Sequence, residues 1–297
     1  MRLNGAVGIP TSLRKRADRF ADRHIRHGAR KVLWTQPTAN LGNFLYDWMH
    51  AFTWQARGED IVCLVTPKVG PWLPLFGEAA ERLVVRRSDV RLTDRREKDV
   101  YSDYGRSFSQ SELDAFIEGF LEPSAAFSPD LIPRTRRLGP SDVLINVRRG
   151  DYVAVEAHRV KYAFALDEYL MAALSTVRND GHIDRIQVVS DGIDWCAANL
   201  GWLNDHCRHV QFVTEPLRPA VHMAMLSRAP RLILANSTFS YWGGYLNTWA
   251  HDAPSRVIAP WFHARPEGAA WQVDPSWTLI KDIPSEWRLP ESSTSPG

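Results

Sequence analysis

The sequence predicts an α/β protein in which parallel strands alternate with helices. Beyond residue 142, short apolar runs rich in β-branched residues, such as VLINV (143–147) and RIQVVS (185–190), alternate with longer amphipathic stretches. This alternation is typical of a doubly wound parallel sheet. The 297 residues suit one large domain or two of about 150 residues each. Two such units joined by a linker would place a cleft between them.

The elements are predicted from the period of their apolar residues. KVLWT (31–35) and IVCLVT (61–66) have the short, apolar character of strands, and the stretch after ANLGN (39–43) has apolar residues every three or four positions until Gly58. The other predicted elements are, in order, a helix running into a strand (73–85), helix 111–124 with Ser111 as its N-cap, strand 143–147, a helix around 167–177, strand 185–190, helix 193–202, strand 210–214, helix 220–229, strand 231–235, helix 237–250 and strand 256–260.

Changes in composition divide the chain into five segments. A basic extension (1–30) precedes an amino-terminal α/β domain (31–127), and proline and charge mark a linker (128–142). A second α/β domain (143–288) follows, and the Ser/Pro-rich tail (289–297) is expected to be disordered.

The composition is that of an ordinary globular protein. The formal charge of +2 gives no whole-molecule argument for nucleic-acid binding. Three cysteines are too few for a disulfide framework, and no apolar run reaches the roughly 18 residues that span a bilayer. Because the amino terminus has no signal-peptide pattern, we expect a cytoplasmic protein. His206, Cys207 and His209 lack a second pair at zinc-finger spacing, so no metal site is predicted.

The basic extension has apolar residues at helical spacing, namely Leu13, Ala17, Phe20, Ala21 and Ile25. This pattern fits two interpretations. One is a solvated extension, the more common outcome for a charged run. The other is a basic amphipathic helix in peripheral contact with an anionic membrane surface.

Polar residues gather where predicted strands end, which is where ligands bind in open α/β sheets. The run 143–147 is followed by Arg148, Arg149, Gly150 and Asp151. A guanidinium matches phosphate oxygens bidentately, and side-chain alternation is expected to send only one of the two arginines toward a ligand. Gly150 permits a tight turn, and Asp151 can anchor an arginine. A strand-end salt bridge and an exposed Arg-Gly-Asp adhesion loop are the competing interpretations.

Three further polar sites follow other predicted strands. The hydroxyl groups of Ser237–Ser240 lie where a helix begins, and they can bind an anion or simply cap the helix. In the other domain, Gly42 allows close backbone approach and Asn43 is a neutral hydrogen-bonding residue. Asp191 can accept two N–H groups of a guanine or cap the next helix.

Several familiar motifs are missing from the sequence. It contains no G-x-G-x-x-G, G-x-x-x-x-G-K-[ST], G-x-S-x-G or H-E-x-x-H motif, and no D-x-D that would hold a divalent cation on a diphosphate. A diphosphate bound by this chain would therefore be neutralised by arginine side chains and backbone N–H groups.

Together the strand-exit segments resemble the motifs of the α-1,2-fucosyltransferase family, glycosyltransferase family 11. The resemblance covers roughly residues 31–280 and rests on LGN (41–43), NVRRGDYV (146–153), VVSDGIDWC (188–196), LILANSTFSYWGGYLN (232–247) and VIAP (257–260). It implies an inverting, metal-independent transferase with two Rossmann-like halves and a GT-B-like cleft. Such an enzyme moves L-fucose from GDP-β-L-fucose to a glycan hydroxyl, often the 2-OH of a galactoside, without a cofactor.

The resemblance also assigns roles. Arg148 would bind the β-phosphate, Asp191 would lie near the guanine, and Asn43 would face the leaving-group oxygen or the acceptor. The candidate residues are Arg148, Asn43 and Asp151 as catalytic, Asn146, Arg148, Arg149, Asp191, Asn236, Ser237, Thr238, Phe239 and Ser240 as donor-binding, and Gly42 and Gly150 as turn residues.

The chain departs from the family's pattern at Asn40, Phe44, Asn146, Gly192 and His222. Asn146 stands where His is usual, and Gly192 replaces the second Asp of an S-D-D motif. These changes leave the diphosphate arginine in place but bear on acceptor choice and proton transfer, for which Asp151 and Glu156 are candidates by position.

Two alternative functions stay open. Nothing in these motifs recognises the fucose itself, so transfer of another GDP-sugar is the first. A non-catalytic nucleotide-sugar or glycan binder, suggested by Asn146 and Gly192, is the second. The expected partners are a GDP-sugar and a glycan acceptor, with no nucleic acid. Peripheral contact of the basic extension with the inner membrane face is the alternative to a solvated extension.

Overall fold

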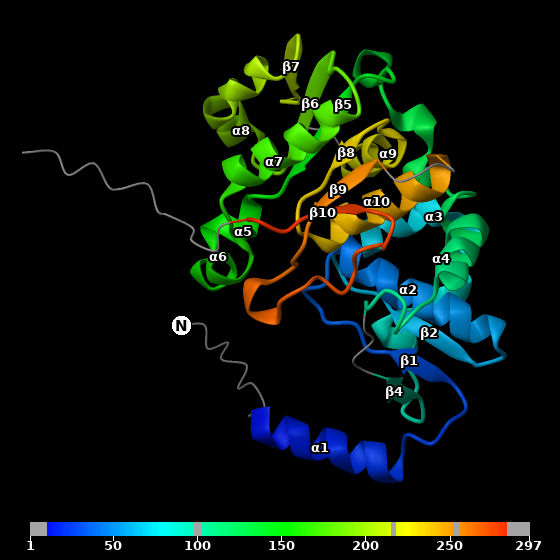
Figure 1. Ribbon diagram of the computed structural model, residues 1–297. Coiled ribbons are helices and arrows are strands. Elements are labelled where there is room, and N and C mark those ends of the chain that lie inside the picture. The colour runs from blue at the N-terminus through cyan, green and yellow to red at the C-terminus, as the bar shows by residue number, and fades with distance from the viewer. Residues whose placement is uncertain (1–10, 98–101, 215–217, 252–255, 284–297) are drawn as a thin grey trace, which may run out of the picture. The chain divides into compact units, whose positions relative to one another are not determined.

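The computed structural model describes residues 11–97, 102–214, 218–251 and 256–283 (Figure 1). The chain divides into two compact units, unit 1 (Met1–Tyr101) and unit 2 (Ser102–Gly297). The division falls before Ser102 instead of in the predicted 128–142 linker. That segment contains two short 3-10 turns, Pro129–Leu131 and Arg134–Arg136.

Unit 1 is built on a parallel four-stranded sheet in the order β3-β2-β1-β4. Its elements are α1 (Thr11–His24), β1 (Lys31–Leu33), α2 (Leu41–Ala56), β2 (Ile61–Leu64), the 3-10 turn Gly70–Trp72, α3 (Leu73–Leu83), β3 (Val84–Val85), the 3-10 turn Arg87–Asp89 and β4 (Arg95–Glu97). The predicted strands at 31–35 and 61–66 and the helix after ANLGN are confirmed. Strand β4 was not predicted because its sequence, RRE, has no apolar pattern.

Unit 2 is built on a parallel six-stranded sheet in the order β10-β9-β8-β5-β6-β7. The strands are β5 (Val143–Val147), β6 (Arg185–Ser190), β7 (His209–Phe212), β8 (Leu232–Ile233), β9 (Val257–Pro260) and β10 (Thr278–Ile280). The helices are α4 (Gln110–Phe116) continued by a π-turn (Ile117–Leu121), α5 (Gly150–Ala154), α6 (Glu156–Tyr162), α7 (Leu166–Asn179), α8 (Ile193–Asn199), α9 (Pro219–Arg228) and α10 (Thr238–His251), with short 3-10 turns between them.

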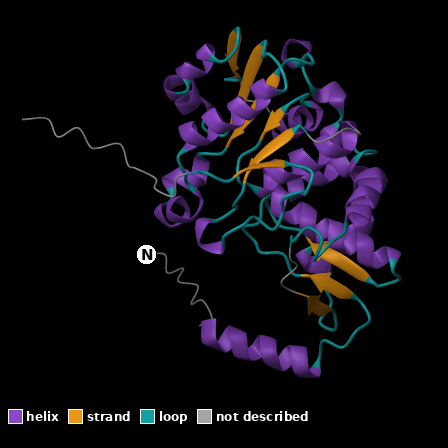
Figure 2. Ribbon diagram, viewed as in Figure 1, coloured by secondary structure: helices purple, strands orange, loops and turns teal. Residues whose placement is uncertain are grey.

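The α/β class predicted from the sequence is confirmed, with two parallel sheets flanked by helices (Figure 2). In unit 2 the chain adds β6 and β7 on one side of β5 and then crosses to add β8, β9 and β10 on the other. The strand order therefore reverses between β5 and β8. In sheets of this kind such a switch point opens a crevice at the carboxyl ends of the strands.

Helix α10 is held close to its neighbours by two adjacent glycines. A Cβ on Gly243 would lie 2.7 Å from side-chain atoms of Leu226, and one on Gly244 would lie 2.5 Å from the Trp277 ring. Real Cβ atoms do not approach that closely, so the glycines let α10 pack tightly and fix where its first turn lies.

Several local predictions need correction or lie outside the described residues. The cap of α4 is Ser109 and not Ser111, because the Ser109 hydroxyl accepts the Glu112 N–H and the Glu112 carboxylate accepts the Ser109 N–H in a capping box. Helices α5 and α6 were not predicted. The tail (289–297) lies outside the description, as do the first ten residues of the basic extension. Within the described ranges, no helix is long and apolar enough to cross a membrane.

Candidate functional site

Three of the predicted polar segments come together at the carboxyl edge of the sheet in unit 2. Arg148 follows β5, Asp191 follows β6, and the first turn of α10 follows β8. Arg148 contacts Asp191, and the Ser240 hydroxyl donates a hydrogen bond to Asn146 Oδ1 at 2.5 Å. These contacts place the cluster at the switch point between β5 and β8.

The Arg148 guanidinium lies between two carboxylates. Its Nη2 is 2.5 Å from Asp151 Oδ1 and its Nη1 is 2.6 Å from Asp191 Oδ2. The guanidinium also lies 5.3 Å above the Tyr152 ring, and the side chain is 30% exposed. The competing interpretation of a strand-end salt bridge therefore describes Arg148 in this structure, because each of its two terminal nitrogens contacts a carboxylate.

Arg149 has different surroundings. Its guanidinium lies 3.5 Å above the Trp195 ring of α8, and burial lowers the pKa of this guanidinium. Its backbone N–H donates to Asp191 Oδ1 at 2.7 Å. A Cβ on Gly192 would lie 2.9 Å from the Arg149 Cβ. The departure at Gly192 thus leaves room for the Arg149 side chain to stack on the indole.

Asp191 ties the β5 exit to the β6 exit. One of its oxygens accepts the Arg149 backbone N–H and the other contacts Arg148. A Cβ on Gly150 would lie 2.3 Å from Asp191 Oδ2, so a larger residue there would require the Asp191 carboxylate to move. The Asp191 carboxylate, which is predicted to lie near a guanine, therefore also orients the segment 148–150 after β5.

The first turn of α10 is capped and linked to β5. Ser237 Oγ accepts the Ser240 N–H at 3.1 Å and lies 2.6 Å from Ser240 Oγ. Both serines are buried, whereas Thr238 and Phe239 are half-buried. The hydroxyls thus serve as cap and link, and the remaining N–H groups at this helix start are the ones suited to an anion.

Asn236 has a structural position beside this turn. Its side-chain amide donates to the carbonyl oxygens of Tyr162 and His263, both at 2.9 Å. It therefore fixes the end of α6 and the loop after β9 against the exit of β8.

Two histidines near the cluster were missed by the sequence prediction. His158 Nδ1 lies 3.4 Å from Asp151 Oδ2. The His263 ring lies 5.5 Å from the Tyr162 ring and 5.6 Å from the Tyr241 ring, and burial lowers the pKa of His263 to about 4. His263 comes just after the strand VIAP, and this strand-exit position was the signal that would have identified it.

The predicted residues of unit 1 lie at the start of α2. Gly42 is buried and Asn43 is exposed in the first turn, and Asn40 makes no side-chain cap bond. One turn later, Asp47 Oδ2 accepts a hydrogen bond of 2.7 Å from the Thr35 hydroxyl. Burial raises the pKa of Asp47 to about 6, against the lowering effect of that hydrogen bond. Asp47 was missed, although a lone acid among apolar helix residues was visible in the sequence.

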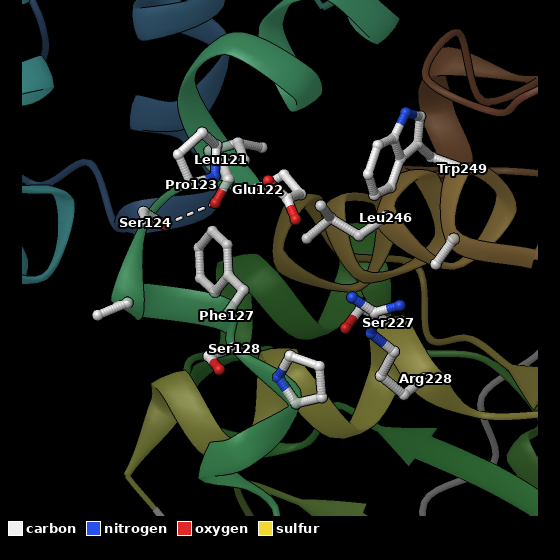
Figure 3. A pocket seen from close by; sticks show the side chains of 13 residues that line it. Leu121, Glu122, Pro123, Ser124, Phe127, Ser128, Ser227, Arg228, Leu246 and Trp249 are labelled. Atoms are coloured by element: carbon white, nitrogen blue, oxygen red, sulfur yellow. Dashed lines mark hydrogen bonds between the residues drawn. The ribbon is translucent and has the colours of Figure 1, made fainter.

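A cavity of about 370 Å³ lies elsewhere in unit 2. Figure 3 shows Phe127, Leu246 and Trp249 around it, together with the charged Glu122 and Arg228. The helix ends that line it, those of α9 and α10, precede strands β8 and β9. The cavity is therefore at the amino edge of the sheet, opposite the Arg148 cluster.

Metal ligands are a separate matter. Over the part of the chain that is described, no three His, Cys, Asp or Glu side chains are grouped so as to hold a metal ion. Metal independence of the chemistry stays a prediction.

Comparison with known proteins gives a family match. The model of glycosyl transferase family 11 matches residues 135–255, which contain Arg148, Asp191 and all of α10. The chain is 30% identical over 143 residues to an alpha-1,2-colitosyltransferase of Escherichia coli, covering 48% of each chain. It is 33% identical over 104 residues to galactoside 2-alpha-L-fucosyltransferase SEC1 of Bos taurus, covering 34% of this chain and 27% of the relative.

A third relative is galactoside alpha-(1,2)-fucosyltransferase 1 of Sus scrofa, 30% identical over 128 residues, which are 42% of this chain and 34% of the relative. The matches thus span about half the length of these relatives or less.

Proposed function

We infer that this chain, whose residues 135–255 match the model of glycosyl transferase family 11, is an α-1,2-fucosyltransferase. It would move L-fucose from GDP-β-L-fucose to a glycan hydroxyl, with the 2-OH of a galactoside as the first candidate acceptor. The observation that carries the proposal is the meeting of Arg148, Asp191 and the start of α10 at the switch point of a family-matched sheet.

Diphosphate binding would proceed by exchange of partners on Arg148. In the cluster, Arg148 is held by Asp151 and Asp191, and we propose that an incoming diphosphate displaces one of these carboxylates. Asp191 is also held by a backbone N–H and would stay. Asp151 would move, because His158 offers it a second partner at 3.4 Å. The first N–H groups of α10 would then complete the phosphate site.

The bond-breaking step would be driven by electrostatics. As the C1–O bond of the donor breaks, negative charge grows on the β-phosphate and positive charge on the sugar. A fixed donor aimed at such developing charge is worth about 3 kcal/mol. The acceptor hydroxyl would attack the opposite face of C1, which gives inversion, and its proton would leave to a base.

Two carboxylates of unit 2, Asp151 and Glu156, are candidates for that base by position. We include in the proposal a GT-B-like arrangement of two Rossmann-like halves with a cleft. The strand order of unit 2 supports this for that half.

The test is a transfer assay with GDP-fucose and a β-galactoside, read out by GDP release and by mass of the glycan product. We expect a product one deoxyhexose heavier, and equal rates with and without EDTA. Release of GDP that depends on added divalent metal would overturn the cation-free mechanism. The lack of any product with a panel of galactosides would show that the acceptor is not a galactoside.

Another GDP-sugar is the second candidate donor. It is favoured by the colitosyltransferase among the relatives, since that protein's name indicates a different deoxy sugar. Parallel assays with GDP-fucose, GDP-mannose and GDP-colitose separate these donors by kcat/KM.

A non-catalytic binder is the candidate from another class. It is favoured by Arg148 being held on both sides by carboxylates. Slow GDP release from GDP-fucose without an acceptor would exclude it, whereas binding without release would support it.

A further inference from the structure

The helix α1 (Thr11–His24) in unit 1 has two chemically different faces. On one face, Asp18 Oδ1 lies 3.0 Å from Arg26 Nη2 and 2.9 Å from Arg96 Nη1, and Asp22 Oδ1 lies 2.5 Å from Arg26 Nη1. Arg26 is buried, and the Arg96 guanidinium stacks 4.0 Å above the Trp34 ring. The acidic residues of α1 therefore face the rest of unit 1 and form ion pairs there.

The opposite face of α1 combines exposed apolar and basic side chains. Leu13, Arg16, Phe20 and Arg23 are spaced by three and four residues and so share one face. Leu13 is 53% exposed and Phe20 is 61% exposed. Arg19 is also exposed beside them. With the acids paired on the other side, this face presents positive charge around a pair of apolar side chains.

We propose that this outward face of α1, defined by Leu13, Arg16, Phe20 and Arg23, docks on an anionic lipid surface. Its charge is complementary to acidic headgroups, and its large apolar side chains can enter the boundary between headgroups and acyl chains. A nucleic acid would use the arginines but give Leu13 and Phe20 nothing to bury them. A second copy of the chain would bring like charges together.

The expected strength follows from the number of charges. Each basic side chain near an anionic membrane raises partitioning by about fivefold, and salt screens this effect over a distance of about 8 Å at physiological ionic strength. Binding should therefore be reversible, salt-sensitive and dependent on both charge and insertion.

The experiment is flotation of the full chain with vesicles of phosphatidylglycerol and phosphatidylcholine in equal parts, and with vesicles of phosphatidylcholine alone. We expect flotation with the anionic vesicles only. The double variant Arg16→Glu/Arg23→Glu should lower the bound fraction by at least about 25-fold, from about fivefold for each charge lost. Phe20→Ser should lower it further in the same assay, because insertion is lost while the charges remain.

The matched control is Arg134→Glu/Arg178→Glu, which changes the net charge equally at exposed positions of unit 2. It should float like the unmodified chain. Equal losses in both double variants would show a bulk charge effect and overturn the proposal. A Phe20→Ser variant that binds like the unmodified chain would also overturn the proposal. Binding would then depend on charge alone, and such a contact fits a nucleic acid equally well. Donor transfer measured in parallel separates this proposal from the proposed function, because α1 has no part in the chemistry.

Discussion

Carboxylates at or near the strand exits have opposite surroundings in the two units. In unit 2, Asp151 and Asp191 lie within 2.6 Å of the Arg148 guanidinium. In unit 1, Asp47 lies beside a hydroxyl, that of Thr35, and burial raises the pKa of Asp47 to about 6. The same residue type is thus held as a charged partner in one unit and pushed toward its protonated form in the other.

The difference teaches what each edge can do chemically. The guanidinium of unit 2 makes that edge a place where anions exchange, because a carboxylate bound to Arg148 can be replaced by a phosphate of the same charge sign. The buried acid of unit 1 makes that edge a place where a proton can be held or released near neutral pH. The two strand-exit edges therefore differ in the chemistry that their side chains can support.

Removing the guanidinium should have the largest effect on this contrast. Arg148→Ala should lower kcat for fucose transfer by more than about 100-fold, since one donor to developing charge is worth about 3 kcal/mol. Arg149→Ala is the matched control and should cost much less, because its guanidinium stacks on Trp195. Equal losses in the two variants would show that the arginines are not divided between ligand and structure.

Changing the acid of unit 1 should alter how stability depends on pH. The pKa of Asp47 is raised from 3.8 to about 6, so its contribution to stability is present below pH 4 and is lost as the pH rises through 6. The loss is about 3 kcal/mol at 1.36 kcal/mol per pKa unit. Asp47→Asn should therefore gain stability relative to the unmodified chain by this amount between pH 4 and pH 7, measured by urea unfolding.

The exposed Glu78 supplies the control for that experiment. Glu78→Gln should keep the pH dependence of the unmodified chain. If Asp47→Asn also keeps it, the carboxylate is not held near its protonated form and the contrast between the units fails.

Removing the charge of one of the two carboxylates that hold Arg148 in unit 2 should have a smaller effect. Asp151→Asn removes the charge that competes with a diphosphate for Arg148. We expect GDP to bind about threefold to fivefold more tightly by calorimetry, since a part-exposed ion pair contributes up to about 1 kcal/mol. Weaker GDP binding would mean that Asp151 holds Arg148 in its working position instead of competing with the ligand.

Restoring the family's residue beside the cluster should have the smallest effect. In Asn146→His, a ring nitrogen can take over as acceptor for the Ser240 hydroxyl. Transfer should be preserved or raised, because the hydrogen bond that links β5 to the start of α10 is kept. Loss of transfer would show that Asn146 takes part in a different chemistry.

The sequence predicted the elements with strong apolar periodicity and the gathering of polar residues at strand exits. Strands β5, β6 and β9 are buried runs of Val and Ile, so their pattern determines them locally. Strand β4 could not be predicted, because its charged sequence forms a strand only through pairing with β1.

The side-chain contacts within the site were harder to predict than the helices and strands. The sequence placed Arg148 at a ligand edge, but its contact with Asp191 joins residues 43 positions apart and depends on β5 and β6 being neighbours. His158 was missed because its contact with Asp151 joins two short helices, α5 and α6, that were not predicted.

The most direct test is a crystal structure of the chain with GDP bound. The exchange mechanism predicts a β-phosphate oxygen within roughly 3 Å of Arg148 Nη2, with the Asp151 carboxylate moved toward His158 and Asp191 still on the Arg149 N–H. A nucleotide bound away from the β5–β8 switch point, with Arg148 still between Asp151 and Asp191, would contradict it.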